Sequence, residues 1–251
     1  MTVDPDNPYT QMQRRFYDAE APNMASENHV GHNFNPDYWE ILLEPVYFRP
    51  QDWAGKAALD IGCGAGRNVA NLLGLADWEE VAGGDISWQN IDHSRTFLEA
   101  KGLSRFALYT TSGIDLQPIP SARYDFIMST IVLQHIAVWD IRHQIFQDVL
   151  RVARPGAVFS FQMAMYPEGR RDTAGYFENL WTVPNTNGGY DVTVPNPEVL
   201  INELVELGFQ RVTFQLRPEW DYNQRQHTVG GNTWIYVQAW TPSTSSTSST
   251  P

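Results

Sequence analysis

The residues best suited to chemistry lie in one short stretch, LDIGCGAGRN, at positions 59–68. Glycines at 62, 64 and 66 alternate with other residues, and Asp60 precedes them. Glycine lets a chain turn sharply and approach a ligand closely because it has no Cβ. An apolar run, Ala57–Ile61, comes before the glycines, and a segment with helical spacing, Arg67–Leu75, follows them. The first N–H groups of a helix are unpaired, so the pattern predicts a strand–loop–helix unit that binds a nucleotide-like ligand.

A second carboxylate, Asp85, ends the next predicted strand, 19 residues after Gly66. A carboxylate at this point can accept hydrogen bonds from both hydroxyls of a ribose. Two cofactor classes then compete. A dinucleotide fingerprint counted from Gly62 requires Gly or Ala where the chain has Arg67. A nicotinamide-dependent oxidoreductase therefore fits less well than a protein that binds a cationic nucleoside bearing an amino acid.

The elements that must hold these residues alternate along the chain. Beyond the first two strands, we expect strands at Phe106–Thr110, Tyr124–Thr130, Ala157–Met163, Phe209–Leu216 and Thr233–Ala239, and helices at Ser87–Ala100, Val138–Ala153 and Pro197–Leu207. Strands that alternate with helices predict βαβ units with right-handed crossovers. The expected fold is α/β, with a doubly wound, mostly parallel, seven-stranded sheet that binds ligands beyond the carboxyl ends of its strands.

Three segments lie outside this pattern. Residues 1–50 are polar and aromatic, with an expected helix over 36–47, and predict an N-terminal cap on a core that spans 51–240. Within the core, residues 164–196 are long for a simple connection and predict a lid insertion. Residues 241–251 contain only Ser, Thr and Pro, which predicts a disordered tail. The turn at Arg154–Gly156 is expected to introduce the fifth strand.

Composition excludes several classes of protein. The chain has 29 acidic and 17 basic residues and a formal charge of −12, which opposes binding to a phosphate backbone, so no nucleic-acid partner is expected. The lone Cys63 excludes an intramolecular disulfide and a Cys-rich zinc site. No targeting segment and no stretch of about 18 apolar residues is evident. We therefore expect a cytoplasmic protein without a membrane partner; the sequence indicates no oligomeric state.

Five motifs in order resemble those of the class I S-adenosylmethionine-dependent methyltransferases, of the type that acts on small molecules. They are LDIGCGAG (59–66), GGDIS (83–87), SGID (112–115), YDFIMSTIVLQHI (124–136) and RVARPGAVFSF (151–161). The resemblance implies a Rossmann-like methyltransferase fold, with S-adenosylmethionine as cofactor and S-adenosylhomocysteine as product. The reaction it implies is direct in-line displacement of the methyl group onto an O or N atom of a small metabolite.

The resemblance also implies roles for residues. The glycines would line the methionine moiety, Asp60 would hold the loop or the amino group, and Asp85 would bind the ribose. The implied cofactor-binding residues are Asp60, Gly62, Cys63, Gly64, Gly66, Asp85, Ile86, Ile114, Asp115, Thr130, Ile131 and Gln134. Many relatives have an acidic residue nearer Gly113, so the adenine contact lies at Asp115 or a residue or two before it.

The acceptor side is predicted from residue types. His135, at the end of the fourth strand, could serve as a general base, because the pKa of histidine suits proton transfer; the alternative is a histidine that only packs or holds the helix start. Candidate acceptor contacts are Tyr17, His29, His32, Tyr166, Tyr176 and Trp181. His29 and His32 have the i,i+3 spacing of metal ligands, but few partners lie nearby, so no metal is expected. An NAD-dependent oxidoreductase, a non-catalytic cofactor-binding regulatory module and a protein or peptide acceptor remain alternatives.

Overall fold

A seven-stranded sheet forms the centre of the protein. The computed structural model describes residues 3–25, 49–165, 175–182, 192–218, 220–221, 226–227 and 233–243. The strands are β1 (Ala57–Ile61), β2 (Glu80–Asp85), β3 (Phe106–Thr110), β4 (Tyr124–Ser129), β5 (Ala153–Met165), β6 (Gln210–Pro218) and β9 (Thr233–Trp240), in the order β3-β2-β1-β4-β5-β9-β6. Two further short strands, β7 (Trp220–Asp221) and β8 (Gln226–His227), pair only with each other.

The sheet is mostly parallel, as predicted. Strands β1 to β5 pair in parallel, and β9 runs antiparallel to both β5 and β6. All five residues of β1 are buried, and four of them are apolar, Asp60 being the exception. A central parallel strand is covered on both faces, which explains this composition. Strands β2 and β3 lie on one side of β1, and β4 and β5 lie on the other, so the strand order reverses between β1 and β4. Open sheets of this kind bind ligands at such a point.

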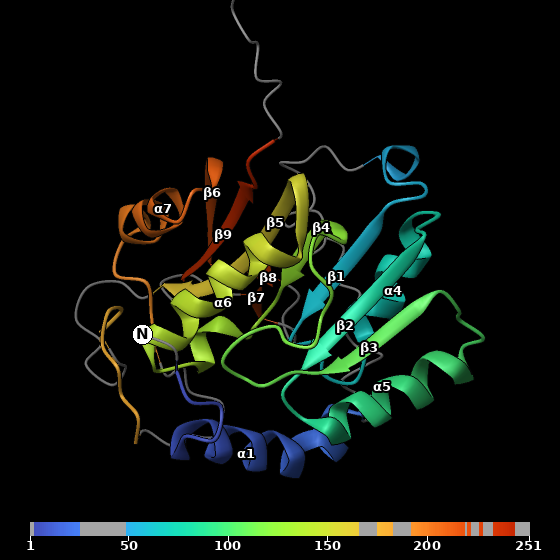
Figure 1. Ribbon diagram of the computed structural model, residues 1–251, viewed down its shortest axis with the longest axis horizontal. Coiled ribbons are helices and arrows are strands. Elements are labelled where there is room, and N and C mark those ends of the chain that lie inside the picture. Colours follow the sequence, from blue (N-terminus) through green and yellow to red (C-terminus); the bar gives the residue numbers. More distant parts are fainter. Residues whose placement is uncertain are drawn as a thin grey trace, which may run out of the picture.

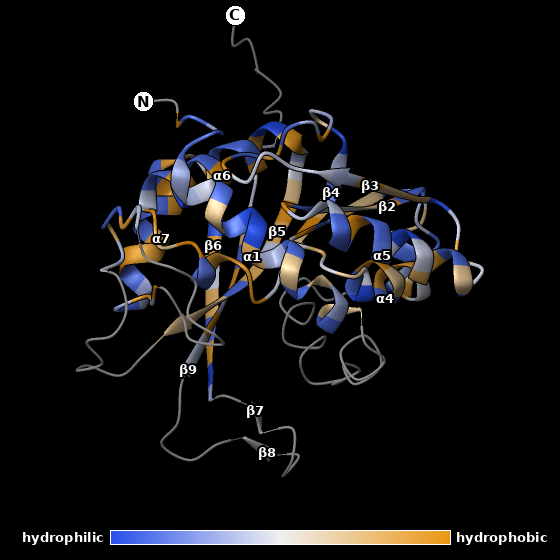
Figure 2. Ribbon diagram, turned by 90° about the horizontal axis from the view of Figure 1, so that it is seen from below, coloured by the Kyte–Doolittle hydropathy of each residue, from blue (hydrophilic) through white to orange (hydrophobic). Residues whose placement is uncertain are grey.

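Helices cover both faces of the sheet (Figure 1). They are α1 (Pro8–Met24), α4 (Arg67–Leu75), α5 (Trp88–Ala100), α6 (Trp139–Val152) and α7 (Pro197–Glu206), with short 3₁₀ turns η2 (Pro50–Asp52) and η3 (Leu133–His135). Side chains of α6 and α7 share one buried apolar cluster with alternate strand residues, and those of α4 and α5 share the other. Figure 2 shows hydrophilic and hydrophobic residues on each of these helices, as expected when one side packs on a sheet.

Helix α1 was not predicted, although its start has a recognisable cap. The Asn7 side chain accepts a hydrogen bond from the Thr10 N–H at 2.9 Å, and Pro8 occupies the first helical turn. Figure 1 shows α1 along the edge of the sheet at which the arrowheads of β2 and β3 end. The helix predicted over residues 36–47 lies outside the described residues.

The other helices and strands confirm the predictions, with shifted ends. Strand β5 begins at Ala153 and runs through the Arg154–Gly156 segment, so the turn expected there was wrong. The pairing of β4 with β5 jumps from Tyr124–Ala153 to Phe126–Val158, and this bulge absorbs the Pro and Gly. At the other end of the core, Thr241 is buried and its Oγ1 accepts a hydrogen bond from the Ala157 N–H at 2.9 Å. Residues 244–251 of the predicted tail lie outside the described residues.

Candidate active site

A cavity lies at the carboxyl edge of the parallel strands. It encloses about 840 Å³ of empty space, its open mouth included. The walls come from the glycine loop, the ends of β2 and β4, the loop after β3, and α1. The lining residues are Tyr9, Thr10, Gln13, Tyr17, Met24, Ile61, Gly62, Gly64, Gly84, Asp85, Ile86, Asn90, Thr111, Gly113, Asp115, Leu116, Ile131, Val132, His135, Ile136 and Ile145.

The glycine loop needs its glycines for two reasons. Gly62, Gly64 and Gly66 have φ angles of +72°, +51° and +87°, a region that other residues rarely adopt. A Cβ on Gly62 would lie 2.3 Å from the Val132 side chain, and one on Gly66 would lie 2.2 Å from Ser94 Oγ. At Gly64 the nearest atom would be Met24 Sδ at 3.8 Å, so this position faces the cavity. Gly66 does not line the cavity; it caps the start of α4.

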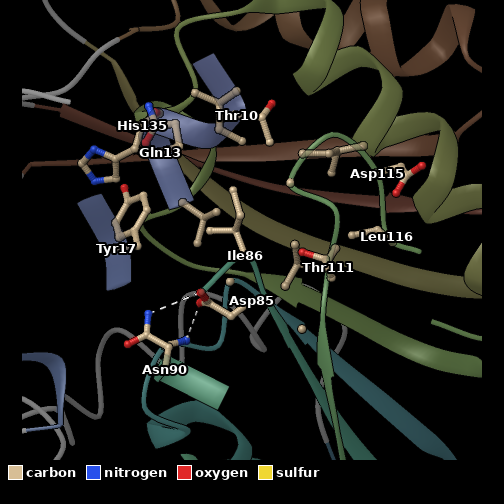
Figure 3. Close-up of a pocket in the computed structure, with 18 of the residues that line it drawn as sticks. Thr10, Gln13, Tyr17, Asp85, Ile86, Asn90, Thr111, Asp115, Leu116 and His135 are labelled. Atoms are coloured by element: carbon tan, nitrogen blue, oxygen red, sulfur yellow. Dashed lines mark hydrogen bonds between the residues drawn. The ribbon is translucent and has the colours of Figure 1, made fainter. Parts of the chain in front are cut away.

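Asp85 holds the loop as well as facing the cavity. Its Oδ2 accepts a hydrogen bond from the Gly64 N–H at 2.9 Å. Its Oδ1 accepts hydrogen bonds from the Ser87 N–H at 2.9 Å and from Asn90 Nδ2 at 3.3 Å (Figure 3). Burial raises the pKa of Asp85, and these hydrogen bonds oppose the rise. A carboxylate has about four acceptor positions, so one position, on Oδ2, is left for a ribose hydroxyl.

Asp60 is a carboxyl group whose charged form is disfavoured by burial. Its side chain is fully buried at the end of β1, and neither carboxylate oxygen has a hydrogen-bond partner among the described residues. Burial raises its pKa to about 8; Asp85 adds to the rise, whereas Arg67 and Asn68 oppose it. Asp60 lies behind the loop and does not line the cavity. An ionised buried carboxylate requires a nearby cation, so a cationic ligand in the loop would suit this group.

The adenine side is built differently from the prediction in one detail. Ile86 lines the cavity and packs against Gly113, where a Cβ would lie 2.4 Å from the Ile86 side chain. Ile114 is buried in the core cluster and does not line the cavity; Leu116 does. Asp115 lines it too, but its Oδ1 accepts hydrogen bonds from Ser112 Oγ and from the Gln117 N–H.

His135 lies at the opposite end of the cavity from Asp85. It ends the 3₁₀ turn η3, and the Tyr17 hydroxyl points toward its imidazole (Figure 3). Ile131, beside it, also lines the cavity and has a φ of +56°, a strained conformation for a β-branched residue. Such strain concentrates at functional sites. The predicted His135 and Tyr17 are therefore brought together, and the predicted Ile131 lines the same cavity.

Helix α1 closes the cavity and supplies the residues that the sequence did not indicate. The Tyr9 hydroxyl accepts hydrogen bonds from the Ala137 N–H at 2.7 Å and from Gln13 Nε2 at 2.9 Å. At the other end of the helix, the Ser87 hydroxyl donates to Asp18 Oδ1 at 2.6 Å. The Asn7-Pro8 cap was the signal that could have identified this helix. The helix therefore bridges the regions around Asp85 and His135.

Several predicted residues do not reach the cavity. Cys63 packs into the core, and burial raises the pKa of its thiol. Thr130 accepts a hydrogen bond from Asn68 at 2.9 Å, and Gln134 is fully buried. The two acceptor candidates on the described part of the insertion, Tyr176 and Trp181, do not line the cavity either. Tyr176 is buried, and its hydroxyl donates to Glu203 Oε2 at 2.6 Å, whereas Trp181 packs edge-on against Tyr9. His29, His32 and Tyr166 lie outside the described residues.

Comparison with known proteins agrees with this geometry. Residues 59–161 match the family described as "Methyltransferase domain". Among solved structures, a Haemonchus contortus phosphoethanolamine N-methyltransferase 2 in complex with S-adenosyl-L-methionine is 14% identical, with a TM-score of 0.65. The match covers 90% of this chain but only 60% of the Haemonchus protein.

Two other structures match over nearly their full length. The [4+2]-cyclase SpnF is 16% identical with a TM-score of 0.66, over 94% of this chain and 98% of SpnF. A SAM-dependent methyltransferase from Aquifex aeolicus is 15% identical with a TM-score of 0.58, over 94% of this chain and 99% of that protein. At these identities the structural likeness shows the fold. Together with the family match over residues 59–161, it supports the predicted resemblance of the motif-bearing core to the class I S-adenosylmethionine-dependent methyltransferases.

Proposed function

We propose that the chain transfers a methyl group from S-adenosylmethionine to an O or N atom of a small molecule that binds beside His135. The observation that carries the proposal is the polarity of the cavity. The buried Asp85 carboxyl group lies at its glycine-loop end, with the buried Asp60 behind that loop, and a histidine with a facing tyrosine lies at the other end. This arrangement suits a cationic cofactor at one end and a proton-bearing nucleophile at the other.

The residues at the loop end fit the cofactor. Its ammonium group would add to the positive charge of Arg67 and so favour the ionised form of the buried Asp60. A ribose hydroxyl would donate to the acceptor position that Asp85 has left, and the methionine moiety would lie along Gly64, where a side chain would obstruct it. When bound, the cofactor supplies an electrophilic methyl group on a sulfonium.

The protein's own contribution is position, exclusion of water and removal of a proton. Displacement at a methyl group requires the reactants to be in line, and a closed site keeps water out. Helix α1 closes the site through Tyr9 at one end and Asp18 at the other. His135 is the group that would accept the proton of a hydroxyl or amine nucleophile.

The described part of the cavity argues for a particular class of acceptor. The Haemonchus relative is named for a phosphorylated amine, phosphoethanolamine. None of the described residues that line the cavity here is Arg or Lys, so this part of the site offers no full positive charge to a phosphate. We therefore propose an acceptor without a phosphate group, such as a phenol or an amine.

The test has two steps. Calorimetric titration with S-adenosylhomocysteine, with NAD as the control, should show binding of the former only. Purified protein is then incubated with S-adenosylmethionine labelled in the methyl group and with sets of small phenols, amines and phosphorylated amines. The expected result is label in a phenol or amine, lost in His135→Asn. Binding of S-adenosylhomocysteine without label transfer to any of the three sets of compounds would contradict the proposal and favour a non-catalytic binding module. It would also leave a reaction other than methyl transfer, since the name of the [4+2]-cyclase SpnF indicates such a reaction for a protein of this fold.

A further inference from the structure

A second hollow, separate from the cofactor cavity, lies between α4 and α5. It encloses about 630 Å³, its open side included. The residues that line it are Arg67, Ala70, Asn71, Phe97, Lys101 and Leu103. Two of them are cationic and none of these is acidic, on a chain whose formal charge is −12. We call this hollow the α4–α5 groove.

Within the described part of the chain, the cations of the α4–α5 groove form no ion pair. Among the residues that the structure describes, neither Arg67 nor Lys101 has a carboxylate oxygen within 4.0 Å. Arg67 Nε donates to Asn68 Oδ1 at 3.3 Å, and Lys101 Nζ lies 5.0 Å from the centre of the Phe97 ring. In the same groove, the Asn71 Nδ2 group is buried and has no hydrogen-bond partner in the described structure. Among the described residues, the two cations thus lack an anionic partner, and the Asn71 amide lacks an acceptor.

We propose that the α4–α5 groove binds an organic anion with an apolar body. The phosphate or carboxylate head would lie between Arg67 and Lys101, and the Asn71 amide would turn to donate to it. Phe97 and Leu103 would cover the apolar body. A guanidinium binds such heads through two parallel N–H groups, and burial of one phenyl ring adds the apolar contribution that a bare inorganic ion lacks.

The α4–α5 groove is coupled to the cofactor loop through Arg67. This residue follows Gly66 directly and begins α4. Its positive charge lowers the pKa of the buried Asp60 and so favours the ionised carboxylate. An anion beside Arg67 offsets that charge and disfavours the ionised Asp60. On the proposed function, ligand in the groove therefore weakens binding of S-adenosylhomocysteine, and by linkage the cofactor weakens binding in the groove to the same extent.

The first experiment measures binding in the α4–α5 groove alone. Phenyl phosphate is titrated into the full chain by calorimetry, at constant ionic strength adjusted with NaCl. Lys101→Gln should weaken binding at least fivefold. Lys56→Gln is the matched control. Lys56 is the only other lysine of the sequence, and its Nζ also lies 5.0 Å from the centre of an aromatic ring, that of Trp53. This variant should leave the binding of phenyl phosphate unchanged. Inorganic phosphate should bind more weakly than phenyl phosphate. An absence of saturable binding, or equal losses in both lysine variants, overturns the proposal.

The second experiment measures the coupling. The Kd of S-adenosylhomocysteine should rise severalfold in saturating phenyl phosphate, and Lys101→Gln should remove the effect. If phenyl phosphate binds but leaves the Kd of S-adenosylhomocysteine unchanged, the proposed anion binding in the groove is supported and the proposed coupling is wrong. If S-adenosylhomocysteine itself does not bind, the proposed function fails, whereas phenyl phosphate binding still decides the groove. Competition that persists in Lys101→Gln would mean that the anion enters the cofactor cavity, which refutes the proposal.

Discussion

The buried carboxyl group of Asp60 should make the stability of the cofactor-free protein fall as the pH rises. In the folded chain its pKa is raised to about 8 by burial, against a usual value of 3.8. Between these two values the folded state binds a proton that the unfolded state has lost, so stability decreases with increasing pH. At ~1.4 kcal/mol per pH unit, the loss between pH 4 and pH 8 is about 6 kcal/mol.

Asp60→Asn removes this dependence, because an amide stays neutral and has nearly the same shape. We expect the free energy of unfolding of the variant, relative to the natural chain, to rise by several kcal/mol between pH 4 and pH 8. Urea denaturation at a series of pH values measures it. Asp92→Asn, on the exposed side of α5, is the control and should show no comparable change. Parallel stability curves for Asp60→Asn and the natural chain would refute the interpretation.

The same group should couple cofactor binding to proton release. If Asp60 ionises when a cationic ligand binds, affinity for S-adenosylhomocysteine rises about tenfold between pH 6 and pH 7, since one proton leaves per ligand below the pKa of about 8. In Asp60→Asn the affinity is weaker at pH 8, and this contribution to its pH dependence is missing. Calorimetry in two buffers of different ionisation enthalpy counts the protons directly. Equal proton counts for both proteins would show that Asp60 does not ionise on binding.

Three further variants test the site. Gly64→Val places a branched side chain toward Met24, inside the cavity, at a φ of +51°, and should abolish binding of S-adenosylhomocysteine in calorimetry; normal binding would show that the loop is not where the ligand lies. Asp85→Ala should weaken binding of S-adenosylhomocysteine by about 1–3 kcal/mol, the contribution of a charged hydrogen-bond partner. Unchanged affinity in a folded variant would show that Asp85 does not bind the ribose. Tyr9→Phe leaves the buried Ala137 N–H without its acceptor and should lower the free energy of unfolding by about 1–3 kcal/mol in urea titration. No change would mean that the hydroxyl does not fix α1.

The fold was predictable because its signals are local. The apolar run Ala57–Ile61 became β1 with the predicted ends, and the helical spacing of Arg67–Leu75 became α4. Strand β5 shows where local signals fail. Pro155 and Gly156 are typical of a turn, but pairing with β4 extends the strand across them through a bulge. The sequence of one segment does not reveal such a bulge, because the pairing with the neighbouring strand determines where it forms.

The cofactor side was predictable for the same reason. Gly62, Gly64 and Asp85 meet because parallel strands bring their carboxyl ends to one edge, and the loop and its partner carboxylate are recognisable as motifs. Ile114 is one of the predicted cofactor residues that do not line the cavity. One position along an irregular loop decides whether a side chain enters the core or the cavity, and no periodicity exists there to indicate the direction.

The acceptor side was harder to predict because α1 builds much of it by contacts distant in sequence. Tyr9 binds Ala137, 128 residues away, and Ser87 binds Asp18, 69 residues away. Each is an ordinary residue pair without a motif, and its place depends on the whole sheet being formed. The same helix covers the glycine loop with Met24 and approaches His135 with Gln13 and Tyr17. On the proposed function, the acceptor would therefore contact a segment outside the family match at 59–161, so that one cofactor-binding core could serve different substrates.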